Sequence, residues 1–356
     1  MPETNATILI PDISGFTEFM TSTELSHASL AINMLIEAIL KAVGDEYHVS
    51  EIEGDAVLLI KKGAAPSQQE ILDTCLAIFN AFHFQRSWMQ DYTVCPCGAC
   101  QALVKLSLKF VAHHGPLAEI KVGGFVKQSG KEMIVAHRLL KNSINNDEYL
   151  LVTEQLLQNV TGATALPETG WATASEEYAS IGKVDYRFML LNEKRKQAPL
   201  PPKPATDYYT DDTPYLELDI AADFFTVYMT VMNIPGRAAW APGLQKVEQD
   251  MPAVVIGSIH HCQFDDYHTV VSPLRMLMTD DSITFAESCH IKELNLHLVH
   301  EFICKKLDEN TCRLVCRCMN AGNETLSPGT QAMLWDKLNQ MALQLKDYCE
   351  KPATVA

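Results

Sequence analysis

The stretch TILIPDISGFT, residues 7–17, predicts how the first part of this 356-residue chain folds. Its apolar run ILI has the composition of a buried strand, and Asp12 follows that run. A second aspartate, Asp55, lies in EIEGDAVLLI, residues 51–60, between a glycine and another apolar run. Each carboxylate therefore stands beside a glycine at the edge of a predicted strand.

Two aspartates at the edges of neighbouring strands can hold divalent cations together. Mg²⁺ prefers oxygen ligands and commonly uses one or two carboxylates plus the phosphates of a substrate. Two such ions about 3.5–4 Å apart stabilise both the attacking and the leaving oxygen. Asp12 and Asp55 therefore predict a site for Mg²⁺ or Mn²⁺ with a nucleoside triphosphate. The alternative is that each aspartate only caps a turn, because aspartate is common beside glycine in turns.

Four segments resemble the class III nucleotidyl cyclases, the adenylate and guanylate cyclase family. DISGFT, residues 12–17, is similar to the first metal motif of that family, and EIEGD, residues 51–55, is similar to the second. HGP at residues 114–116 resembles the strand and turn that follow, and GKEMIVAHRL at residues 130–139 resembles the catalytic helix. The resemblance covers about residues 6–193.

This resemblance implies an α+β fold with a ferredoxin-like core, in which helices pack on an antiparallel sheet as a cyclase-type sandwich. It implies divalent ions held by Asp12, Asp55 and the backbone of Ile13. It also implies a homodimer, because the active sites of this family form between two chains.

The catalytic helix departs from the family pattern. Active cyclases carry an asparagine four residues before an arginine, on the same helix face. Here Arg138 is present, but Ile134 takes the asparagine position and cannot donate a hydrogen bond. The segment IVAHRLLKN, residues 134–142, resembles a variant subgroup of cyclase-like bacterial proteins of unknown function. In that subgroup the variant helix resembles a characteristic of the proteins rather than the loss of a working catalytic helix.

Two positions correspond to residues that read the base in this family. Glu51 matches a glutamate of guanylate cyclases, and Lys127 falls where the second reader would be an aspartate or a cysteine. We therefore expect a degenerate or variant cyclase-like domain that binds nucleotide and metal in a signalling or regulatory role. The alternative is an active cyclase that forms a cyclic 3′,5′-nucleotide and pyrophosphate, with Arg138 stabilising the α-phosphate.

Net charge, apolar stretches and cysteine count indicate which binding partners and which cellular compartment to expect. The net charge of −16 argues against broad binding of nucleic acid or anionic membranes. The first residues lack the basic start and apolar core of a signal peptide. No apolar stretch approaches about 18 residues, so no transmembrane helix is expected. Eleven cysteines, an odd count without an export signal, predict a reduced, cytoplasmic protein.

A proline-rich segment divides the chain into two predicted domains. Residues 194–208 contain four prolines, which favour an extended spacer over a helix or a central strand. We place a cyclase-like domain at residues 1–193 and a second domain at residues 209–356.

Hydrophobic periodicity predicts the elements of both domains. In the first domain we expect strands at 7–10, 106–112, 149–152 and 178–191, helices at 26–47, 68–89 and 131–143, and a hairpin at 49–60. In the second domain we expect strands at 215–220, 254–264, 268–271, 283–287, 300–307 and 312–319, a short helix near 224–228, and a long amphipathic helix at 330–348.

The second domain resembles the START-like or polyketide-cyclase-like superfamily in its order of elements and in WAPG at residues 240–243. The resemblance covers about residues 209–350 and implies a helix-grip fold, a curved sheet around one long helix. Such domains enclose a cavity for a small apolar ligand. The expected lining residues are Trp240, Phe264, Met276, Phe285, Leu314, Cys316 and Leu338.

Three thiols lie within six residues in CPCGAC, residues 95–100. Cys95, Cys97 and Cys100 are three of the four ligands that a structural zinc site requires. The sequence offers His113, His114 or Cys75 as the fourth ligand if the fold brings one of them near. A redox-active Cys-x-x-Cys pair and a purely structural turn are the alternatives.

Overall fold

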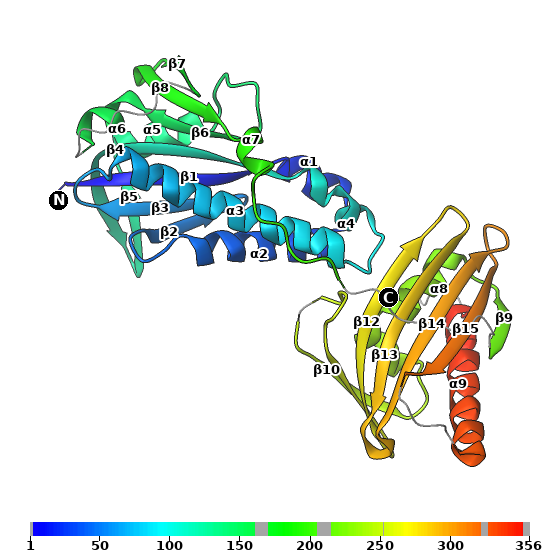
Figure 1. Cartoon of the computed structure of the whole chain (residues 1–356). Helices are drawn as coiled ribbons and strands as arrows, with labels where there is room; N and C mark the ends of the chain where they lie inside the picture. Colours follow the sequence, from blue (N-terminus) through cyan, green and yellow to red (C-terminus); the bar gives the residue numbers. More distant parts are fainter. Residues whose placement is uncertain (1–2, 161–169, 205–214, 252, 322–326, 352–356) are drawn as a thin grey trace. The chain divides into compact units, whose positions relative to one another are not determined.

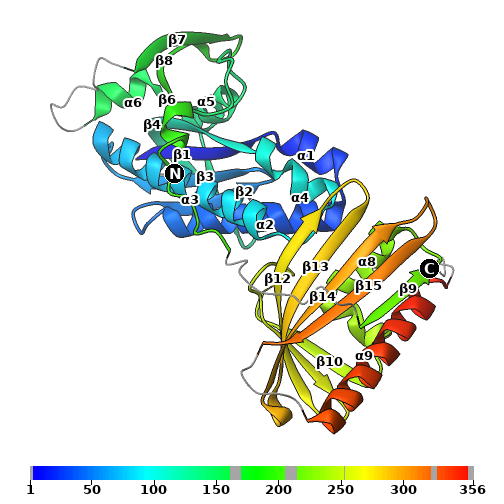
Figure 2. The same cartoon turned by 45° about the vertical axis from the view of Figure 1, so that its right-hand side comes forward.

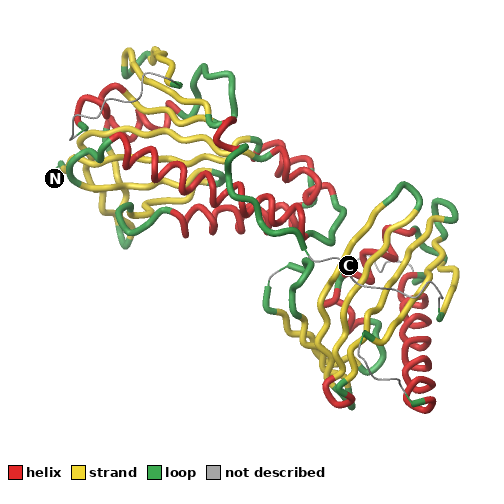
Figure 3. Tube along the Cα trace, in the orientation of Figure 1, coloured by secondary structure: helices red, strands yellow, loops and turns green. Residues whose placement is uncertain are grey.

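The computed structural model describes residues 3–160, 170–204, 215–251, 253–321 and 327–351 (Figure 1). Helices and strands alternate in the first half of the chain, and strands dominate the second half until a final long helix (Figure 3). Helices pack on open sheets in both halves, which confirms the predicted α+β fold class.

The chain divides into two compact units. Met1–Gln90 and Cys97–Pro201 form the first unit, whereas Asp91–Pro96 and Pro202–Ala356 form the second. The step from the first unit to the second at Pro201 and Pro202 falls inside the predicted linker.

The first unit contains an eight-stranded sheet with β1 (Thr4–Ser14) near its centre. The order is β2-β3-β1-β4-β6-β8-β7, and β5 pairs with β4 outside this path. Among the described strand pairs of this sheet, β4 and β6 run parallel and the others run antiparallel. The other strands are β2 (His48–Glu53), β3 (Ala56–Lys62), β4 (Ser107–Val122), β5 (Phe125–Ser129), β6 (Tyr149–Thr153), β7 (Trp171–Tyr178) and β8 (Gly182–Leu190).

Helices cover both faces of this sheet, which explains why β1 is buried from Ala6 to Ser14 and carries the apolar run Ile8-Leu9-Ile10. Ile8 and Ile10 pack against Met133 and Ala136 of α5 (Lys131–Leu139). The helices α2 (Leu25–Ala42) and α3 (Gln68–Tyr92) lie on the other face (Figures 1 and 2). A strand buried on both faces carries a continuous apolar run rather than an alternating one. The remaining helices are α1 (Phe16–Ser22), α4 (Gly98–Ala102), α6 (Glu154–Asn159), α7 (Asn192–Arg195) and the 3₁₀ helix η1 (Leu103–Lys105).

Helix α2 has the length and composition of a membrane span, with 18 residues and a mean hydropathy of 1.2. The sequence was expected to contain no apolar stretch of about this length, so this candidate was missed. Ile32 and Leu35 on one face of α2 are buried, whereas Asn33 and Glu37 on another face are exposed. This division is typical of an amphipathic helix packed by one face against a core.

The second unit contains a seven-stranded antiparallel sheet in the order β10-β11-β12-β13-β14-β15-β9. Helix α9 (Pro328–Cys349) runs alongside this sheet, and α8 (Phe224–Met232) contacts both the sheet and α9 (Figure 2). The strands are β9 (Leu216–Ile220), β10 (Leu244–Gln249), β11 (His260–Phe264), β12 (His268–Met278), β13 (Ser282–Ile291), β14 (Leu296–Lys306) and β15 (Cys312–Asn320), with the 3₁₀ helices η2 (Ile234–Ala239) and η3 (Lys292–Leu294).

Local signals fix the start of the long helix α9. The Ser327 hydroxyl accepts a hydrogen bond from the Thr330 backbone N–H, and Pro328 occupies the first helical turn. Both features are typical of helix N-termini. The helix therefore begins two residues before the predicted start at Thr330.

Two strand predictions had wrong boundaries. The strand expected at 178–191 corresponds to β8, which begins only at Gly182, with a φ of 86°, after a turn at 179–181; β7 before that turn was not predicted. Residues 254–259, expected to begin a strand, form a turn with Gly257 at a φ of 83°, and β10 before them was missed. Positive φ values favour glycine, so a glycine inside an apolar run marked each turn.

Candidate functional site

Asp12 and Asp55 lie on neighbouring strands of the first unit. Asp12 is near the end of β1 and pairs in register with Ala56, the first residue of β3. Asp55 lies in the β2–β3 turn, directly after Gly54, whose φ is 68°. The backbone N–H of Ile13 donates a hydrogen bond to the Asp55 carbonyl at 3.0 Å. This bond holds the second aspartate against the strand that carries the first.

The two carboxylates interact directly. Burial raises the pKa of Asp55, and the Asp12 carboxylate raises it further through its charge and a side-chain hydrogen bond. The positive charge of Lys109 acts in the opposite direction on the same pKa. The pair is therefore a concentration of negative charge in a partly buried place.

Lys109 belongs to this site and was missed by sequence reasoning. It is the register partner of Asp12 on β4, and its Nζ lies 3.2 Å from Asp12 Oδ2. Its side chain is mostly buried, and Nζ also donates to the Leu140 carbonyl at 3.5 Å. The available signal was a lone lysine within the strand sequence SLKFVA, because buried lysines are rare unless paired.

Ile134 and Arg138 occupy the exposed face of α5. The Ile134 side chain is 54% exposed, and Arg138, one turn later, is also exposed. Met133 and Ala136 of the same helix face the core. Among the described residues, no hydrogen bond or ion pair joins Arg138 to either aspartate. Within the described part of one chain, no such contact therefore links the predicted phosphate-binding arginine to the carboxylate pair.

The two predicted base-reading residues contact each other. Lys127 Nζ on β5 donates to Glu51 Oε2 on β2 at 2.9 Å. The other carboxylate oxygen, Glu51 Oε1, is buried and has no hydrogen-bond partner among the described residues. His137 of α5 faces a second acid of the same strand, with Nδ1 3.5 Å from Glu53 Oε2.

The HGP segment has a packing role. His113 Nε2 lies 2.6 Å from Glu132 Oε2 in a buried pair, and the His113 contact lowers the pKa of Glu132. His114 Nδ1 lies 2.9 Å from the Thr7 hydroxyl. A Cβ on Gly115 would come within 2.7 Å of the Glu132 side chain. The segment therefore needs a glycine so that β4 can approach α5.

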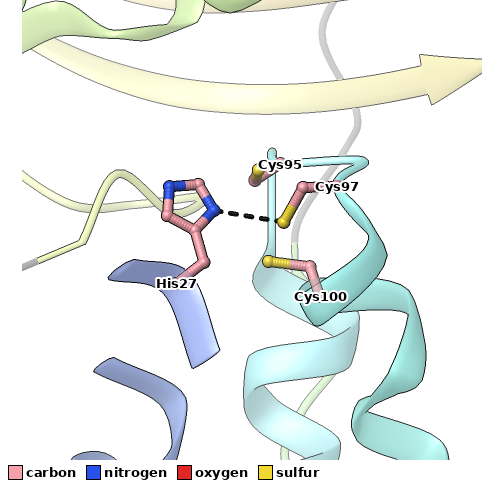
Figure 4. Close-up of side chains that lie close together, drawn as sticks. All are labelled: His27, Cys95, Cys97 and Cys100. Atoms are coloured by element: carbon pink, nitrogen blue, oxygen red, sulfur yellow. Dashed lines mark hydrogen bonds between the residues drawn. The ribbon is translucent and has the colours of Figure 1, made fainter. Parts of the chain in front are cut away.

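The cysteine cluster gains its fourth member from α2. His27, Cys95, Cys97 and Cys100 place one ligand atom each within 4.8 Å of one another, and their side chains converge (Figure 4). His27 Nδ1 lies 3.1 Å from Cys97 Sγ.

The sequence proposed other residues for this fourth position, and those proposals were wrong. His113 and His114 are engaged on β4, and Cys75 is fully buried in α3. His27 was missed because it lies 70 residues before Cys97 in the chain and only the packing of α2 reveals it.

The second unit contains a cavity of about 480 Å³ between the sheet and α9. Its lining is largely apolar, with Leu298 from β14 and Leu334 and Leu338 from α9. Buried polar groups also border it. The Arg237 guanidinium makes two hydrogen bonds to Glu287, at 2.8 and 2.7 Å, and both side chains are almost fully buried.

A buried histidine adds to this polar edge. His300 Nε2 lies 2.7 Å from the Tyr215 hydroxyl. Burial lowers the pKa of His300 to about 3, and the charge of Arg237 contributes in the same direction. This imidazole is therefore neutral at physiological pH.

Fewer of the expected residues line the cavity than the sequence predicted. Phe264 and Leu338 line it, but the other five expected residues do not. Phe285 packs instead between Tyr228 of α8 and Phe302, with ring centroids 6.4 Å apart in each pair. Helix α8 thus fills one end of the space. The five residues outside the cavity are Trp240, Met276, Phe285, Leu314 and Cys316; all but Met276 are buried.

Comparison with known proteins gives partial matches. A family model described as "Protein of unknown function (DUF2652)" matches residues 32–149. An uncharacterized protein of Mycobacterium tuberculosis is 32% identical over 124 residues, which are 35% of this chain and 58% of that protein. The chain thus matches less than two thirds of the length of this curated relative. The family match includes Asp55 and Lys109 but not Asp12 or His27.

Similar solved structures include three nucleotidyl cyclases. A bacterial light-regulated adenylyl cyclase has a TM-score of 0.39 and 14% identity, covering 56% of this chain and 97% of that chain. The guanylyl cyclase Cya2 has a TM-score of 0.37 and 14% identity, covering 53% and 92%. The adenylyl cyclase CyaB from P. aeruginosa has a TM-score of 0.35 and 13% identity, covering 53% and 95%.

Proposed function

We propose that the first unit binds Mg²⁺ or Mn²⁺ together with a nucleoside triphosphate at Asp12 and Asp55, as a variant nucleotidyl cyclase-like domain. The observation that carries this proposal is the direct interaction of the two carboxylates, each of which belongs to a cyclase-like motif in the sequence. Burial and then repulsion from the Asp12 carboxylate raise the pKa of Asp55. A divalent cation would convert this repulsion into attraction to both groups.

The donor set fits a hard cation. The site offers two carboxylates, and the Ile13 carbonyl faces the same neighbouring strand as the Ile13 N–H, because both groups of a strand residue point to one side. Oxygen donors of this kind suit Mg²⁺ and Mn²⁺. When bound, the ions would neutralise phosphate charge and lower the pKa of an attacking hydroxyl. Lys109 would hold Asp12 in place and add one positive charge for the phosphates.

In this proposal Glu51, Lys127 and Arg138 contact the nucleotide. Glu51 Oε1, which has no hydrogen-bond partner within the described part of the chain, would accept an N–H from a base, and Lys127 would orient the Glu51 carboxylate through Oε2. The exposed Arg138 would reach the phosphates from a second copy of the chain in a homodimer, with Lys141 nearby on the chain. A guanidinium suits this role because its planar fork matches phosphate oxygens.

We propose binding without efficient turnover, because Ile134 lies where the family uses a donor and its side chain is exposed on the same face as Arg138. Loss of one donor that acts in the transition state costs about 10²–10³-fold in rate. The alternative is an active cyclase, which the intact aspartate pair favours. An active enzyme would have to replace the missing donor with another group on this face of α5, such as His137.

The second unit is proposed to bind a small, mainly apolar molecule, as in START-like domains, and to regulate the first unit. The supporting observation is the 480 Å³ cavity with a few buried polar groups at its edge. Binding sites for small molecules commonly combine an apolar lining with a few such groups. A ligand with one polar end would suit the edge formed by Arg237, Glu287 and His300.

Metal binding tests the first proposal without any need for turnover. Titration of Mn²⁺ by electron paramagnetic resonance should show tight binding that strengthens when a nucleoside triphosphate is added. Asp12→Asn and Asp55→Asn should lose this binding, whereas Asp45→Asn, an exposed aspartate in the loop before β2, should retain it. Equal Mn²⁺ binding by all four proteins would reject the site.

Turnover is measured separately. The purified protein is incubated with Mn²⁺ and each of four nucleoside triphosphates, and cyclic nucleotides are detected by mass spectrometry. We expect little or no product. Robust formation of one cyclic nucleotide, abolished by Asp55→Asn, would establish the active alternative instead.

A thermal-shift screen of fatty acids, flavonoids and isoprenoids tests the second unit. A ligand that binds only the folded protein raises its stability by RT ln(1 + [L]/Kd). Leu338→Trp should fill the cavity and abolish the shift, whereas Leu343→Trp on the exposed side of α9 should not. A shift of the same size in the Leu338→Trp protein would place the ligand elsewhere.

A further inference from the structure

We propose that His27, Cys95, Cys97 and Cys100 form a structural zinc site. The four ligand atoms lie within 4.8 Å of one another, and the cluster is the one group of at least three potential metal ligands of this kind found among the described residues. Cys95 and Cys97 are each 5% exposed, and His27 and Cys100 are partly buried. The site is independent of Asp12 and Asp55, and it concerns architecture rather than turnover.

The observed distances are close to those of a tetrahedral zinc centre. Zn–S bonds of about 2.3 Å and Zn–N bonds of about 2.0–2.1 Å place neighbouring ligand atoms roughly 3.5–3.8 Å apart in a tetrahedron. The His27 Nδ1 to Cys97 Sγ distance is 3.1 Å, and all other pairs lie within 4.8 Å. Small side-chain rotations therefore suffice to seat the ion.

The chain places these ligands in a recognised arrangement. Cys97 and Cys100 have the Cys-x₂-Cys spacing of zinc knuckles, and Cys97 is the N-cap residue of α4. Cys95 stands two residues before Cys97 on the same loop, so the loop itself sets its place. His27 comes from the first turn of α2. The Glu24 carboxylate, just before α2, holds the first turn of α4 by accepting the Ala99 N–H at 3.2 Å.

The donor set selects the metal and its role. Three thiolates and one imidazole in a tetrahedral set favour zinc over Mg²⁺ or Ca²⁺, which take oxygen ligands. Four protein ligands close the coordination sphere, which is typical of structural zinc rather than of catalytic zinc with its open position. The ion would tie α2 to α4 and to the segment that precedes α4; His27 and Cys97 are 70 residues apart in the chain.

Metal analysis of the full-length protein tests this proposal first. The protein is purified with a reductant and without added chelator. Elemental analysis should give one zinc per chain, and X-ray absorption at the zinc edge should fit three sulfur neighbours at about 2.3 Å and one nitrogen at about 2.0–2.1 Å. This readout uses the wild-type protein, so it stands even if a variant fails to fold.

Variants then assign the ligands. Cys97→Ser and His27→Ala should reduce zinc content at least tenfold and make the remaining zinc accessible to a colorimetric chelator. Cys349→Ser and His48→Ala are matched controls outside the cluster and should keep one zinc per chain. In Co²⁺-substituted protein, the thiolate-to-metal charge-transfer band should weaken in Cys97→Ser and persist in both controls.

Three outcomes would overturn the proposal. The first is wild-type protein that contains less than one tenth of a zinc per chain and takes up none on addition of zinc. The second is a Cys97–Cys100 disulfide in protein purified without reductant, which would indicate a redox pair. The third is stoichiometric iron with the absorption of an iron–sulfur cluster.

Discussion

Lys127 Nζ donates a hydrogen bond to Glu51 Oε2 at 2.9 Å, so the two residues expected to read a base are paired with each other. This contact raises the pKa of Lys127 and links β2 to β5. One carboxylate oxygen is thereby occupied, and the other, buried one remains available as an acceptor. Base reading at this site would therefore depend on the pair as a unit.

Lys127→Ala should change nucleotide preference more than stability. The lysine is exposed, and exposed ion pairs contribute little to folding. We expect an almost unchanged melting temperature but a changed ratio of affinities for purine nucleotides, because the freed carboxylate can turn. Thermal unfolding and titration with four nucleoside triphosphates check this. Lys183→Ala, which removes another exposed ion pair in the same unit, is the matched control.

Asp55→Asn should make the metal-free protein more stable at neutral pH while removing its response to metal. The pKa of Asp55 is raised in the folded state, so ionisation opposes folding. This penalty is absent below the ordinary aspartate pKa of about 3.9, develops as pH rises towards the folded pKa, and is complete above it.

The asparagine amide cannot ionise. The difference in free energy of unfolding between Asp55→Asn and wild type should therefore be absent below about pH 3.9 and should grow as pH rises above it. Urea unfolding at pH 4 and pH 7, each with and without Mn²⁺, measures it. A less stable metal-free variant at pH 7 would contradict the expected repulsion.

Ile134→Asn restores the donor that active cyclases carry on this helix face. The side chain is 54% exposed, so the change should move stability by no more than about 0.5 kcal/mol. Any cyclase activity should rise, by up to about 10²–10³-fold. Leu25→Asn, on α2 and 68% exposed, is the matched control. If wild type is already active and Ile134→Asn has no effect, other residues perform this role.

The sequence was sufficient to predict that Asp12 and Asp55 lie at the edges of neighbouring strands, because the signals for this arrangement are local. Apolar runs define both strands, glycines define both turns, and the motif order places the carboxylates at one strand edge. The sequence did not predict Lys109 as a member of this site. That lysine reaches Asp12 through strand pairing between residues 97 positions apart (109 − 12), and no local pattern encodes that register.

Glu287→Gln should destabilise the second unit strongly. The Arg237 and Glu287 side chains are 6% and 1% exposed, and removal of one charge leaves the other buried without its partner. Such losses cost about 3–5 kcal/mol, whereas apolar replacement of both partners is often nearly neutral. The free energy of unfolding in denaturant tests this. It is measured for Glu287→Gln, for each of the single variants Arg237→Met and Glu287→Leu, and for the double variant that combines the last two. A double variant as unstable as the worse single variant would contradict it.

Mild acid should weaken the second unit through His300. Its folded pKa of about 3 lies below the ordinary histidine value of about 6.5. The unfolded chain therefore takes up a proton first, and stability present above pH 6.5 is lost as pH falls towards 3. His300→Gln should flatten this part of the profile, whereas His261→Gln, at an exposed position, should not. Urea unfolding at half-unit pH steps gives the measurement.

The cavity of the second unit shows why packing was harder to predict than strand order. Period-two alternation places Phe285, Leu314 and Cys316 on an inward face, and the structure buries all three. The alternation does not reveal how far α8 reaches along that face. Tyr228 from α8 fills one end, so residues that share an inward face divide into solid core and cavity lining.

The central position of β1 has a consequence for the order of events during synthesis. β3 pairs with one edge of β1, and β4 pairs with the other edge. The β4 partner of Thr7 is His114, which is synthesised 107 residues later. Until the ribosome has released β4, this apolar strand presents an open edge, which is a template for association with other chains. Nascent chains that stall within α3 should therefore depend most on chaperones.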